Sequence, residues 1–367
     1  MRFVVPREEL LKPLNLVAGV VERRHTMPVL ANVMVQLEAG QLSLTGSDGE
    51  VELIGRVLLA EPGEEGAITV PARKLVDICK SLPERSEVEF RVEQQRVVMK
   101  SGRSRFTLSS LPASEFPSIE EAATGQMVSL GQGQLKSLLD QTSFAMAQQD
   151  VRYYLNGMLW EMREGSFRVV ATDGHRLAMA TLEGGAASVK DRQLILPRKG
   201  VVELNRLLIS EAEDIHLLVG DAYLRATTME FTFTSKLVDG RFPDYQRVIP
   251  RNTDKEVLAD RDEFKAALSR TAILSNEKYH GVRLKFQDNE LTITANNPEQ
   301  EEAVEILSVV YGYEPLEVGF NVSYLLDVMS VIKGDTVKLS LSDSNSSALL
   351  EDAADPAALY VVMPMRL

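Results

Sequence analysis

The chain of 367 residues is 44% hydrophobic and 25% charged, with one cysteine and a formal net charge of −13. Such a chain is long enough for two or three domains and too apolar to remain disordered. The lone Cys79 excludes a disulfide framework and a cysteine-rich metal site. No apolar run approaches the length of a membrane span, and the first residues lack a secretory h-region, so we expect a cytoplasmic protein.

The negative charge is distributed unevenly along the chain. Residues 1–125 hold 15 basic and 18 acidic side chains, residues 126–253 hold 15 of each, and residues 254–367 hold 10 basic and 20 acidic. An acidic chain repels nucleic acid at long range and does not grip phosphates tightly by charge alone. The composition therefore disfavours a function that depends on strong electrostatic adhesion to nucleic acid.

The first 125 residues predict two helices and two hairpins. Apolar residues spaced three and four apart predict a helix over 7–21, and a short apolar start followed by the same spacing predicts a strand leading into a helix over 70–82. Apolar-polar alternation around turn residues predicts hairpins over 30–50 and 88–100. Cys79 lies inside the second helix, where an inert buried thiol is expected.

The same four elements recur twice more along the chain. The second set is expected over 133–147, 154–175, 196–208 and 215–227, and the third over 261–275, 281–299, 320–332 and 337–350. A period of about 125 residues is that of a whole domain. The sequence therefore predicts an α+β protein of three repeated domains, each with two helices packed on antiparallel sheets, over residues 1–125, 126–253 and 254–367. Linkers are expected near 122–130 and 249–258.

The stretch TDGHRL, residues 172–177, places an acid, an imidazole and a guanidinium within four residues. Its first half recurs as Ser47-Asp48-Gly49 and is replaced by Asn296-Asn297-Pro298, so turn chemistry explains Asp173 and Gly174. His175, Arg176 and Leu177 have no equivalents in the other repeats. The chain has four histidines and no HExxH, phosphate-loop or GxSxG motif. We therefore favour a pocket wall or a surface turn over a catalytic centre.

Two other functions stay open from the residues alone. A nucleic-acid hydrolase would use Asp173 and His175 as its catalytic pair. A single-strand DNA binder would stack bases on Tyr153 and Tyr154, although core packing explains either tyrosine equally well. Activity lost in His175→Ala would favour the hydrolase, and tight, salt-sensitive binding to linear oligonucleotides would favour the single-strand binder.

Five stretches carry a resemblance to a known family: TDGHRL, YYLNGM (153–158), TSKLVDGRFPDY (234–245), NPEQEEA (297–303) and YVVMPMRL (360–367). With these motifs the chain resembles the β subunit of bacterial DNA polymerase III, the sliding-clamp family. The resemblance implies a head-to-tail homodimer whose six domains close a ring around double-stranded DNA, with helices lining the hole and sheets outside. It implies a processivity factor without catalysis, cofactor or metal.

The resemblance also implies partners and their sites. Short linear motifs of the polymerase III catalytic subunit, the clamp loader, other polymerases and repair proteins would dock in a pocket between the second and third domains. The matching pocket positions are Leu155, Thr172, Gly174, His175, Arg176, Leu177, Pro243, Arg247, Val248, Ser347, Val361, Val362, Met363, Pro364, Met365 and Arg366. No membrane contact is implied.

DNA and dimer contacts complete the expected sites. Positions matching a family DNA-contacting loop, together with basic residues expected to face the hole, are Arg24, Arg73, Gln149, Arg152, Tyr153, Tyr154, Arg198 and Lys199. The expected dimer interface pairs Phe106 and Leu108 of the first domain with Ile273 and Leu274 of the third. Charges flank this apolar centre at Lys74, Arg103, Arg105, Glu301 and Glu305. An acidic, solvated face is the plainer interpretation of residues 299–305.

Overall fold

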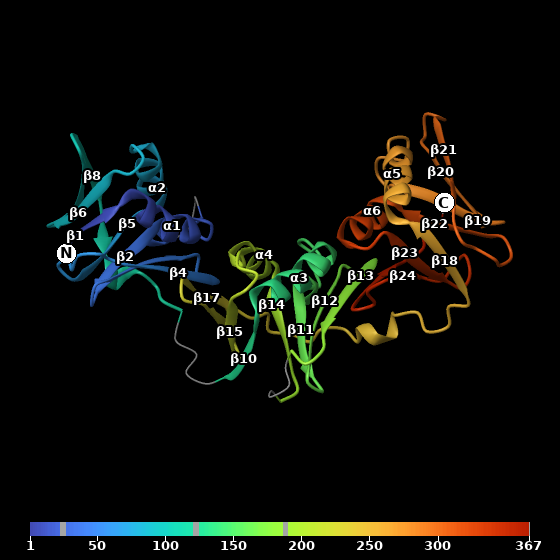
Figure 1. The fold of residues 1–367 in the computed structure, drawn as a ribbon, viewed down its shortest axis with the longest axis horizontal. Helices are drawn as coiled ribbons and strands as arrows, with labels where there is room; N and C mark the ends of the chain where they lie inside the picture. Colours follow the sequence, from blue (N-terminus) through green and yellow to red (C-terminus); the bar gives the residue numbers. More distant parts are fainter. Residues whose placement is uncertain (23–26, 120–124, 186–189, 367) are drawn as a thin grey trace. The chain divides into compact units, whose positions relative to one another are not determined.

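The computed structural model describes residues 1–22, 27–119, 125–185 and 190–366 (Figure 1). Packing divides the chain into two compact units. One comprises Met1–Gly133 with Val202–Leu237, and the other comprises Gln134–Val201 with Val238–Leu367. The middle repeat is shared between them, so each unit is described by itself.

In the first unit, a four-stranded antiparallel sheet has the order β1-β6-β7-β8. Its strands are β1 (Arg2–Pro6), β6 (Glu87–Glu93), β7 (Arg96–Ser101) and β8 (Ser104–Ser109). Strands β1 and β8 are the outer members of this sheet. Helices α1 (Arg7–Ala18) and α2 (Ala72–Ser81) each begin directly after a proline that ends a strand, Pro6 and Pro71.

A nine-stranded sheet completes the first unit, in the order β10-β15-β16-β17-β4-β3-β2-β5-β9. Its strands are β2 (Asn32–Glu38), β3 (Gln41–Ser47), β4 (Val51–Leu58), β5 (Gly66–Pro71), β9 (Leu111–Pro112), β10 (Gln126–Gly131), β15 (Asp214–Val219), β16 (Tyr223–Thr227) and β17 (Phe231–Lys236). The pairing of β17 with β4 joins strands of the first and second repeats, with Phe233 opposite Leu53. The joint between these repeats is therefore a continuous hydrogen-bonded sheet.

Helix α1 lies close against β3 and β4, and two glycines make that approach possible. A Cβ on Gly46 would lie 2.7 Å from the carbonyl oxygen of Val17, and a Cβ on Gly55 would lie 2.8 Å from the Cβ of Pro13. Any larger residue at either strand position would push the helix off the sheet. Cys79 of α2 is buried, as predicted, and burial raises the pKa of its thiol to about 12, which disfavours the reactive thiolate.

The second unit is built around an eight-stranded sheet with the order β14-β11-β12-β13-β25-β24-β23-β18. Its strands are β11 (Gly157–Arg163), β12 (Ser166–Thr172), β13 (Arg176–Leu182), β14 (Arg192–Pro197), β18 (Lys255–Asp260), β23 (Thr336–Leu341), β24 (Ala348–Asp352) and β25 (Ala358–Val362). Strands β13 and β25 pair with Leu177 opposite Val361, and this pairing joins the second and third repeats.

A four-stranded sheet, ordered β21-β20-β19-β22, accompanies it in the second unit. Its strands are β19 (Gly281–Gln287), β20 (Glu290–Asn296), β21 (Glu302–Ser308) and β22 (Leu316–Asn321). Helices α5 (Arg261–Ala272) and α6 (Val322–Val331) pack against each other and have side-chain N-caps. Asp260 accepts from the backbone N–H of Glu263, and Asn321 accepts from that of Ser323.

The helices of the middle repeat, α3 (Gln132–Thr142) and α4 (Arg198–Leu207), lie where the two units divide. Single turns of 3-10 helix occur at η1 (Pro28–Ala31), η2 (Ala113–Glu115), η3 (Ser143–Ala145), η4 (Tyr153–Leu155) and η5 (Tyr245–Arg247). The expected repeat of helix, hairpin, strand-helix and hairpin is confirmed in all three copies.

Both linkers were predicted to end too late, because a strand begins inside each expected range. Strand β10 begins at Gln126 and β18 begins at Lys255, because these residues pair with β15 and β23. The domain boundaries after residues 125 and 253 stay predictions. None of the helices in the described ranges combines the length and apolar character that crossing a bilayer requires.

Candidate functional site

The turn between β12 and β13 is held by its own side chains. The Asp173 carboxylate accepts hydrogen bonds from the backbone N–H groups of His175 and Arg176 at 2.9 and 3.0 Å. The Thr172 hydroxyl donates to the Arg176 carbonyl at 2.6 Å and accepts from the Gly174 N–H at 3.1 Å. Gly174 has φ of +89°, a left-handed conformation that favours glycine. The turn is rigid, and its carboxylate is occupied with holding it.

Arg176 ties this turn to two helical segments. Its guanidinium donates to Asp173 at 3.1 Å, to the carboxylate of Asp327 on α6, and to the carbonyl of Phe144 in η3 at 3.0 Å. It also stacks over the ring of Tyr324, 4.5 Å from the centroid. Only 13% of the side chain is exposed. The guanidinium therefore makes its hydrogen bonds within the protein. Arg176 stabilises the structure of the site and is not a group that binds a ligand.

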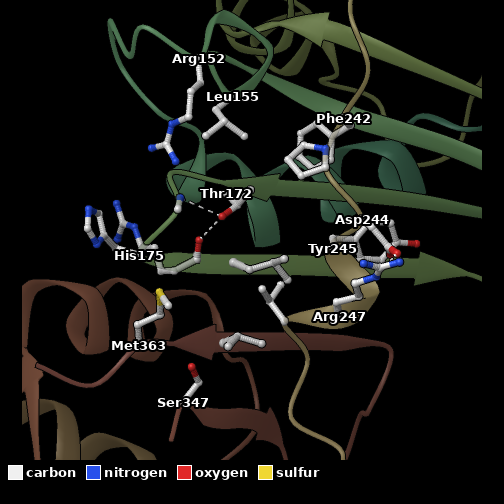
Figure 2. Close-up of a pocket in the computed structure, with 16 residues that line it drawn as sticks. Arg152, Leu155, Thr172, His175, Phe242, Asp244, Tyr245, Arg247, Ser347 and Met363 are labelled. Carbon is white, nitrogen blue, oxygen red and sulfur yellow. Dashed lines mark hydrogen bonds and ion pairs between the residues drawn. The ribbon is translucent and has the colours of Figure 1, made fainter. Parts of the chain in front are cut away.

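A hollow of about 390 Å³ opens beside the turn (Figure 2). We call it the docking hollow. It is lined by Arg152, Leu155, Thr172, Gly174, His175, Arg176, Leu177, Phe242, Pro243, Asp244, Tyr245, Arg247, Val248, Ser347, Val361 and Met363. Figure 2 shows Met363 and Ser347 on the third-repeat side, facing Arg152 and Leu155 of the second repeat. The backbone N–H of Met363 donates to the His175 carbonyl at 3.0 Å and so joins the two sides.

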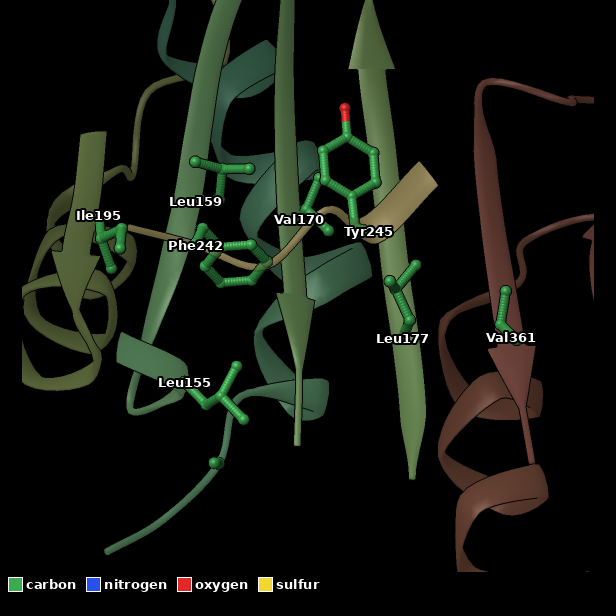
Figure 3. Close-up of a cluster of buried hydrophobic side chains, with 9 residues drawn as sticks. Leu155, Leu159, Val170, Leu177, Ile195, Phe242, Tyr245 and Val361 are labelled. Carbon is green, nitrogen blue, oxygen red and sulfur yellow. The ribbon is translucent and has the colours of Figure 1, made fainter. Parts of the chain in front are cut away.

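An apolar cluster forms the floor of the docking hollow (Figure 3). Leu155, Leu177, Phe242, Tyr245 and Val361 are members of this cluster and also line the hollow. Because they are buried and packed on one another, the floor has a defined shape before any ligand arrives. The site can therefore bind apolar side chains without first reorganising.

Tyr245 anchors this floor through a buried polar network. Its hydroxyl donates to the Glu161 carboxylate at 2.6 Å and accepts from the Arg168 guanidinium at 3.0 Å. Arg168 and Glu161 form an ion pair at 3.3 Å. Burial is the largest cause that raises the pKa of Tyr245, followed by its hydrogen bond to Glu161. The tyrosine is therefore held neutral and fixed in place.

Two cations at the rim differ in how strongly they are bound. The side chain of Arg247 is 84% exposed and pairs with Asp244 at 2.8 Å. Arg152 donates to Asp150 at 3.0 and 2.8 Å and to the Asp173 carbonyl at 3.1 Å. The hydrogen bond from the Arg152 guanidinium is the main cause that lowers the pKa of Asp150 to about 2. Arg247 is thus the rim cation that solvent reaches most freely.

Twelve of the expected pocket positions line the docking hollow, and four do not. The four that do not line it are Val362, Pro364, Met365 and Arg366. Strand alternation buries Val362 on the face opposite Val361. Beyond β25 the backbone bonds to another strand, with the Met365 N–H donating to the Gly319 carbonyl at 2.9 Å, and Met365 and Arg366 line a separate hollow.

Sequence reasoning missed four residues of the docking hollow. These are Arg152, Phe242, Asp244 and Tyr245. The motif FPDY (242–245) was a usable signal, because Phe242 follows the same LxxxxFP spacing as Phe116 in the first repeat. Arg152, expected at DNA, lies at this hollow with its guanidinium already bound. The DNA contact expected of Arg152 stays a prediction.

The other residues expected at DNA are scattered over the two units. Arg73 is exposed on α2, with only a long ion pair to Asp77 at 3.9 Å. Gln149 and Tyr153 are exposed, and the rings of Tyr153 and Tyr154 meet edge to face at 5.7 Å. The remaining three expected residues are Arg198, whose guanidinium donates to the Met146 carbonyl, Lys199, which is partly buried in α4, and Arg24, which lies outside the described residues.

The residues expected at a dimer interface lie on or beside two sheet edges. Strand β8, with exposed Arg103 and Arg105 near its start, is the outer strand of its sheet, and so is β21. Ile273 is 77% exposed and Leu274 is half-buried. Leu108, on β8, is largely buried within its own chain, and its place at a dimer interface stays a prediction. Phe106, on the same face, is half-buried.

Further apolar and charged groups complete these edges. Val304 and Ile306, which were not expected there, are exposed on β21. Glu305 is held by Arg270 through two contacts of 2.7 Å, and this pairing lowers the pKa of Glu305. Glu301 accepts from the Asn297 amide at 2.6 Å, and Lys74 is exposed on α2. Apolar residues occupy both faces of β21 in its sequence EAVEILS, so alternation alone does not identify Val304 and Ile306 as exposed.

The chemistry for catalysis is not assembled at the turn. A general base needs a carboxylate available to a substrate, but both oxygens of Asp173 are engaged, one by backbone N–H groups and one by Arg176. Within residues 1–22, 27–119, 125–185 and 190–366, no three His, Cys, Asp or Glu side chains come together as metal ligands. The arrangement is suited to binding and not to a reaction at Asp173.

Comparison with known proteins gives the family. Models of the N-terminal, central and C-terminal domains of the DNA polymerase III beta subunit match residues 1–120, 129–244 and 246–366. A beta sliding clamp of Pseudomonas aeruginosa is 59% identical over 367 residues, covering all of both chains. The crystal structure of the DNA polymerase III subunit beta from the same organism covers both chains fully, at 59% identity and a TM-score of 0.98.

A further crystal structure, of a sliding clamp from P. aeruginosa bound to griselimycin, also has 59% identity, full coverage of both chains and a TM-score of 0.98. These matches span every repeat described above, and the fold is that of three clamp domains. The chain therefore belongs to the family of the DNA polymerase III beta subunit, the bacterial beta sliding clamps, which are non-catalytic processivity factors.

Proposed function

We propose that this clamp tethers its partners by accepting their short linear peptides in the docking hollow, while two copies of the chain close around double-stranded DNA. Membership of the family implies interactions with DNA and with DNA polymerase. The observation that carries the peptide proposal is the preformed apolar hollow walled by the rigid turn and by Met363.

The hollow suits an extended peptide with aliphatic or aromatic side chains. Leu155, Leu177 and Val361 offer a fixed apolar floor, and Met363 at the rim can adapt to different side chains. Among the cations that line the hollow, the guanidinium of Arg247 is the one solvent reaches most freely, although it pairs with the half-exposed Asp244. A peptide carboxylate near its apolar residues would use that charge for orientation.

A titration with a labelled polymerase tail peptide tests this site. Deleting residues 363–367 should abolish binding, because it removes Met363 from the rim, and Met363→Glu should weaken binding by at least about tenfold, because a charge enters the apolar rim. Met229→Glu is the matched control, since Met229 is 95% exposed and lies outside the hollow. Peptide binding that survives the deletion would count against the site, whatever the fate of DNA binding.

Ring closure would use the outer strands β8 and β21. Each is the last strand of its sheet, so its outward backbone groups are open to pairing with another chain. Ile273, Val304 and Ile306 expose apolar surface beside or on β21, and Phe106 lies on β8. The expected charges are Lys74, Arg103 and Arg105 against Glu301, whereas Glu305 is already paired with Arg270 in its own chain. The copies would therefore meet head to tail.

Enclosure, rather than adhesion, would then hold DNA. The acidic chain, with 53 acidic and 40 basic residues, is poorly suited to strong phosphate binding, and a sliding protein gains from that weakness. Loaded complexes should be retained on circular DNA and lost on linearisation.

Sedimentation of Ile306→Glu, with Met229→Glu as control, should show the dimer mass falling to that of one chain. A dimer unaffected by this change would contradict the β21 interface.

A further inference from the structure

The third repeat contains its own counterpart of the docking hollow. A hollow of about 450 Å³ lies beside the turn Asn296-Asn297-Pro298, and we call it the third-repeat hollow. Four residues that line the docking hollow, Arg152, Leu155, Thr172 and Gly174, correspond after 124 residues to Asn276, Tyr279, Asn296 and Pro298, which line the third-repeat hollow. The two cavities therefore occupy the same place in the repeat.

Strand register supports this equivalence independently of the cavities. Gly157 pairs with Pro197 in the second repeat, and Gly281 pairs with Asn321 in the third. The chain leaving each repeat also bonds at the same place. The Val238 N–H donates to the Ile195 carbonyl at 2.9 Å, and the Met365 N–H donates to the Gly319 carbonyl, the counterpart of Ile195, at 2.9 Å.

The third-repeat hollow differs from the docking hollow in its chemistry. Leu155 is replaced by Tyr279, which is 54% exposed, and the lining includes the cations Arg283 and Arg366. Lys278 lies over the Tyr279 ring, 5.0 Å from its centroid. Within the described residues no ion pair is found for Arg366, and its side chain is exposed. Aromatic surface and positive charge thus replace the aliphatic floor.

Two carboxylates near this hollow are engaged, whereas Glu277 and Glu299, beside the lining residues Asn276 and Pro298, are exposed. Glu317 contacts the Arg283 guanidinium at 3.4 Å, with both side chains about half exposed, and Glu301 accepts from the Asn297 amide at 2.6 Å. The Arg283 contact is weak because it is long and solvated. An incoming carboxylate could therefore compete for Arg283 and pair with Arg366.

We propose that the third-repeat hollow is a second docking site, which takes an extended acidic peptide segment of a partner protein that carries an aromatic side chain. The ring of the peptide packs on Tyr279 and on the stem of Arg283, and its carboxylates pair with Arg283 and Arg366. The site is separate from the docking hollow, so two segments can be held at once. Such bivalence strengthens retention of a weakly held partner.

Methionine-methyl NMR of the full chain tests the proposal, because each hollow has its own reporter. Met363 lines the docking hollow and Met365 lines the third-repeat hollow. The probe is the peptide DGSFPDY, which is the sequence of residues 239–245 with Arg241→Ser to keep it anionic. At an expected Kd on the order of 1 mM, titration to about 5 mM should shift the Met365 signal, whether or not the peptide also shifts Met363 by entering the docking hollow.

Two variants and a matched control make the test specific. Tyr279→Ala and Arg283→Glu should each raise the peptide Kd measured from the Met365 shift by about tenfold, since each removes one main contact. Lys285→Glu makes the same charge change two residues along β19, outside the hollow, and should have no effect. No Met365 shift, a shift at Met363 alone, or equal weakening by Lys285→Glu would overturn the proposal. A stronger Met365 shift with a short oligothymidylate than with the peptide would also overturn it.

Discussion

The first and second repeats build the same turn and use it differently. In the first repeat, Asp48 accepts from the N–H groups of Glu50 and Val51 at 2.8 and 2.7 Å, as Asp173 does in the second. Gly49 and Gly174 have φ of +88° and +89°. The two repeats therefore share the same turn conformation, and this turn alone does not create a binding site.

The two repeats differ over His175, Arg176 and Leu177, where the first repeat has Glu50, Val51 and Glu52. The second repeat has Leu177 in the floor of the docking hollow, and the first has Glu52 at the equivalent position. Glu52 is buried, and its carboxylate accepts from the Ile119 N–H at 3.1 Å. The chain after Phe116 is thereby drawn onto the first-repeat sheet. The change from Glu52 to Leu177 is therefore one of the differences between a sheet surface that binds its own chain and one that lines a hollow.

Placing the first-repeat residue in the second repeat should have the largest effect. Leu177→Glu buries a carboxylate against Val361 and Leu155, where no counterpart of the Ile119 N–H is available among the described contacts. We expect a loss of about 4 kcal/mol in the free energy of unfolding and no measurable peptide binding. Urea denaturation measures the free energy of unfolding, and peptide titration measures the loss of binding. A variant as stable as the parent would show that the floor tolerates charge.

Arg176→Val replaces the arginine that stabilises the turn with valine, the residue at the equivalent position, Val51, of the first repeat. Asp173 and Asp327 lose their guanidinium partner, and the Phe144 carbonyl loses a donor. We expect a loss of about 2 kcal/mol, moderated because Asp327 reaches solvent. Arg247→Ala is the matched control, because that side chain is 84% exposed and should leave the urea midpoint unchanged. Equal midpoints for both variants would remove Arg176 from its structural role.

The two turn glycines offer a paired test. Gly49→Ala and Gly174→Ala should each cost about 1 kcal/mol, because alanine disfavours the left-handed conformation. Only at Gly174 would the new Cβ approach the Arg152 guanidinium, at 2.9 Å. Gly174→Ala should therefore also weaken peptide binding several-fold, and Gly49→Ala should not. Thermal unfolding and peptide titration of both variants measure this difference.

The smallest expected effect is a pH dependence in the first repeat. Burial raises the pKa of Glu52 above its usual range, although the Ile119 N–H and Arg225 oppose the shift. The folded state then binds this proton more tightly than the unfolded state, so stability falls as pH rises through the usual pKa toward the raised one. Glu52→Gln should gain stability relative to the parent as pH rises from 4 to 8. A difference between urea midpoints that is constant over this range would contradict the assignment.

Local chemistry is what the sequence by itself determined. Helices, hairpins and the turn at Thr172 were readable because periodicity, proline and Asx-turn chemistry act over a few residues. Most of the docking hollow was implied only by the family resemblance that the motifs around His175 and Met363 carry. Phe242 and Tyr245 stood in a quoted motif but were not assigned, because their inward packing depends on strands far along the chain.

Tertiary structure alone decided the rest. Pairing of β17 with β4 and of β13 with β25 divides the middle repeat between two units, and no local pattern specifies which edge strands meet. The bond from Met365 to Gly319 moves the last residues out of the docking hollow and into the third-repeat hollow. Such choices follow from long-range hydrogen bonds and burial, whose partners are fixed only when the whole chain packs.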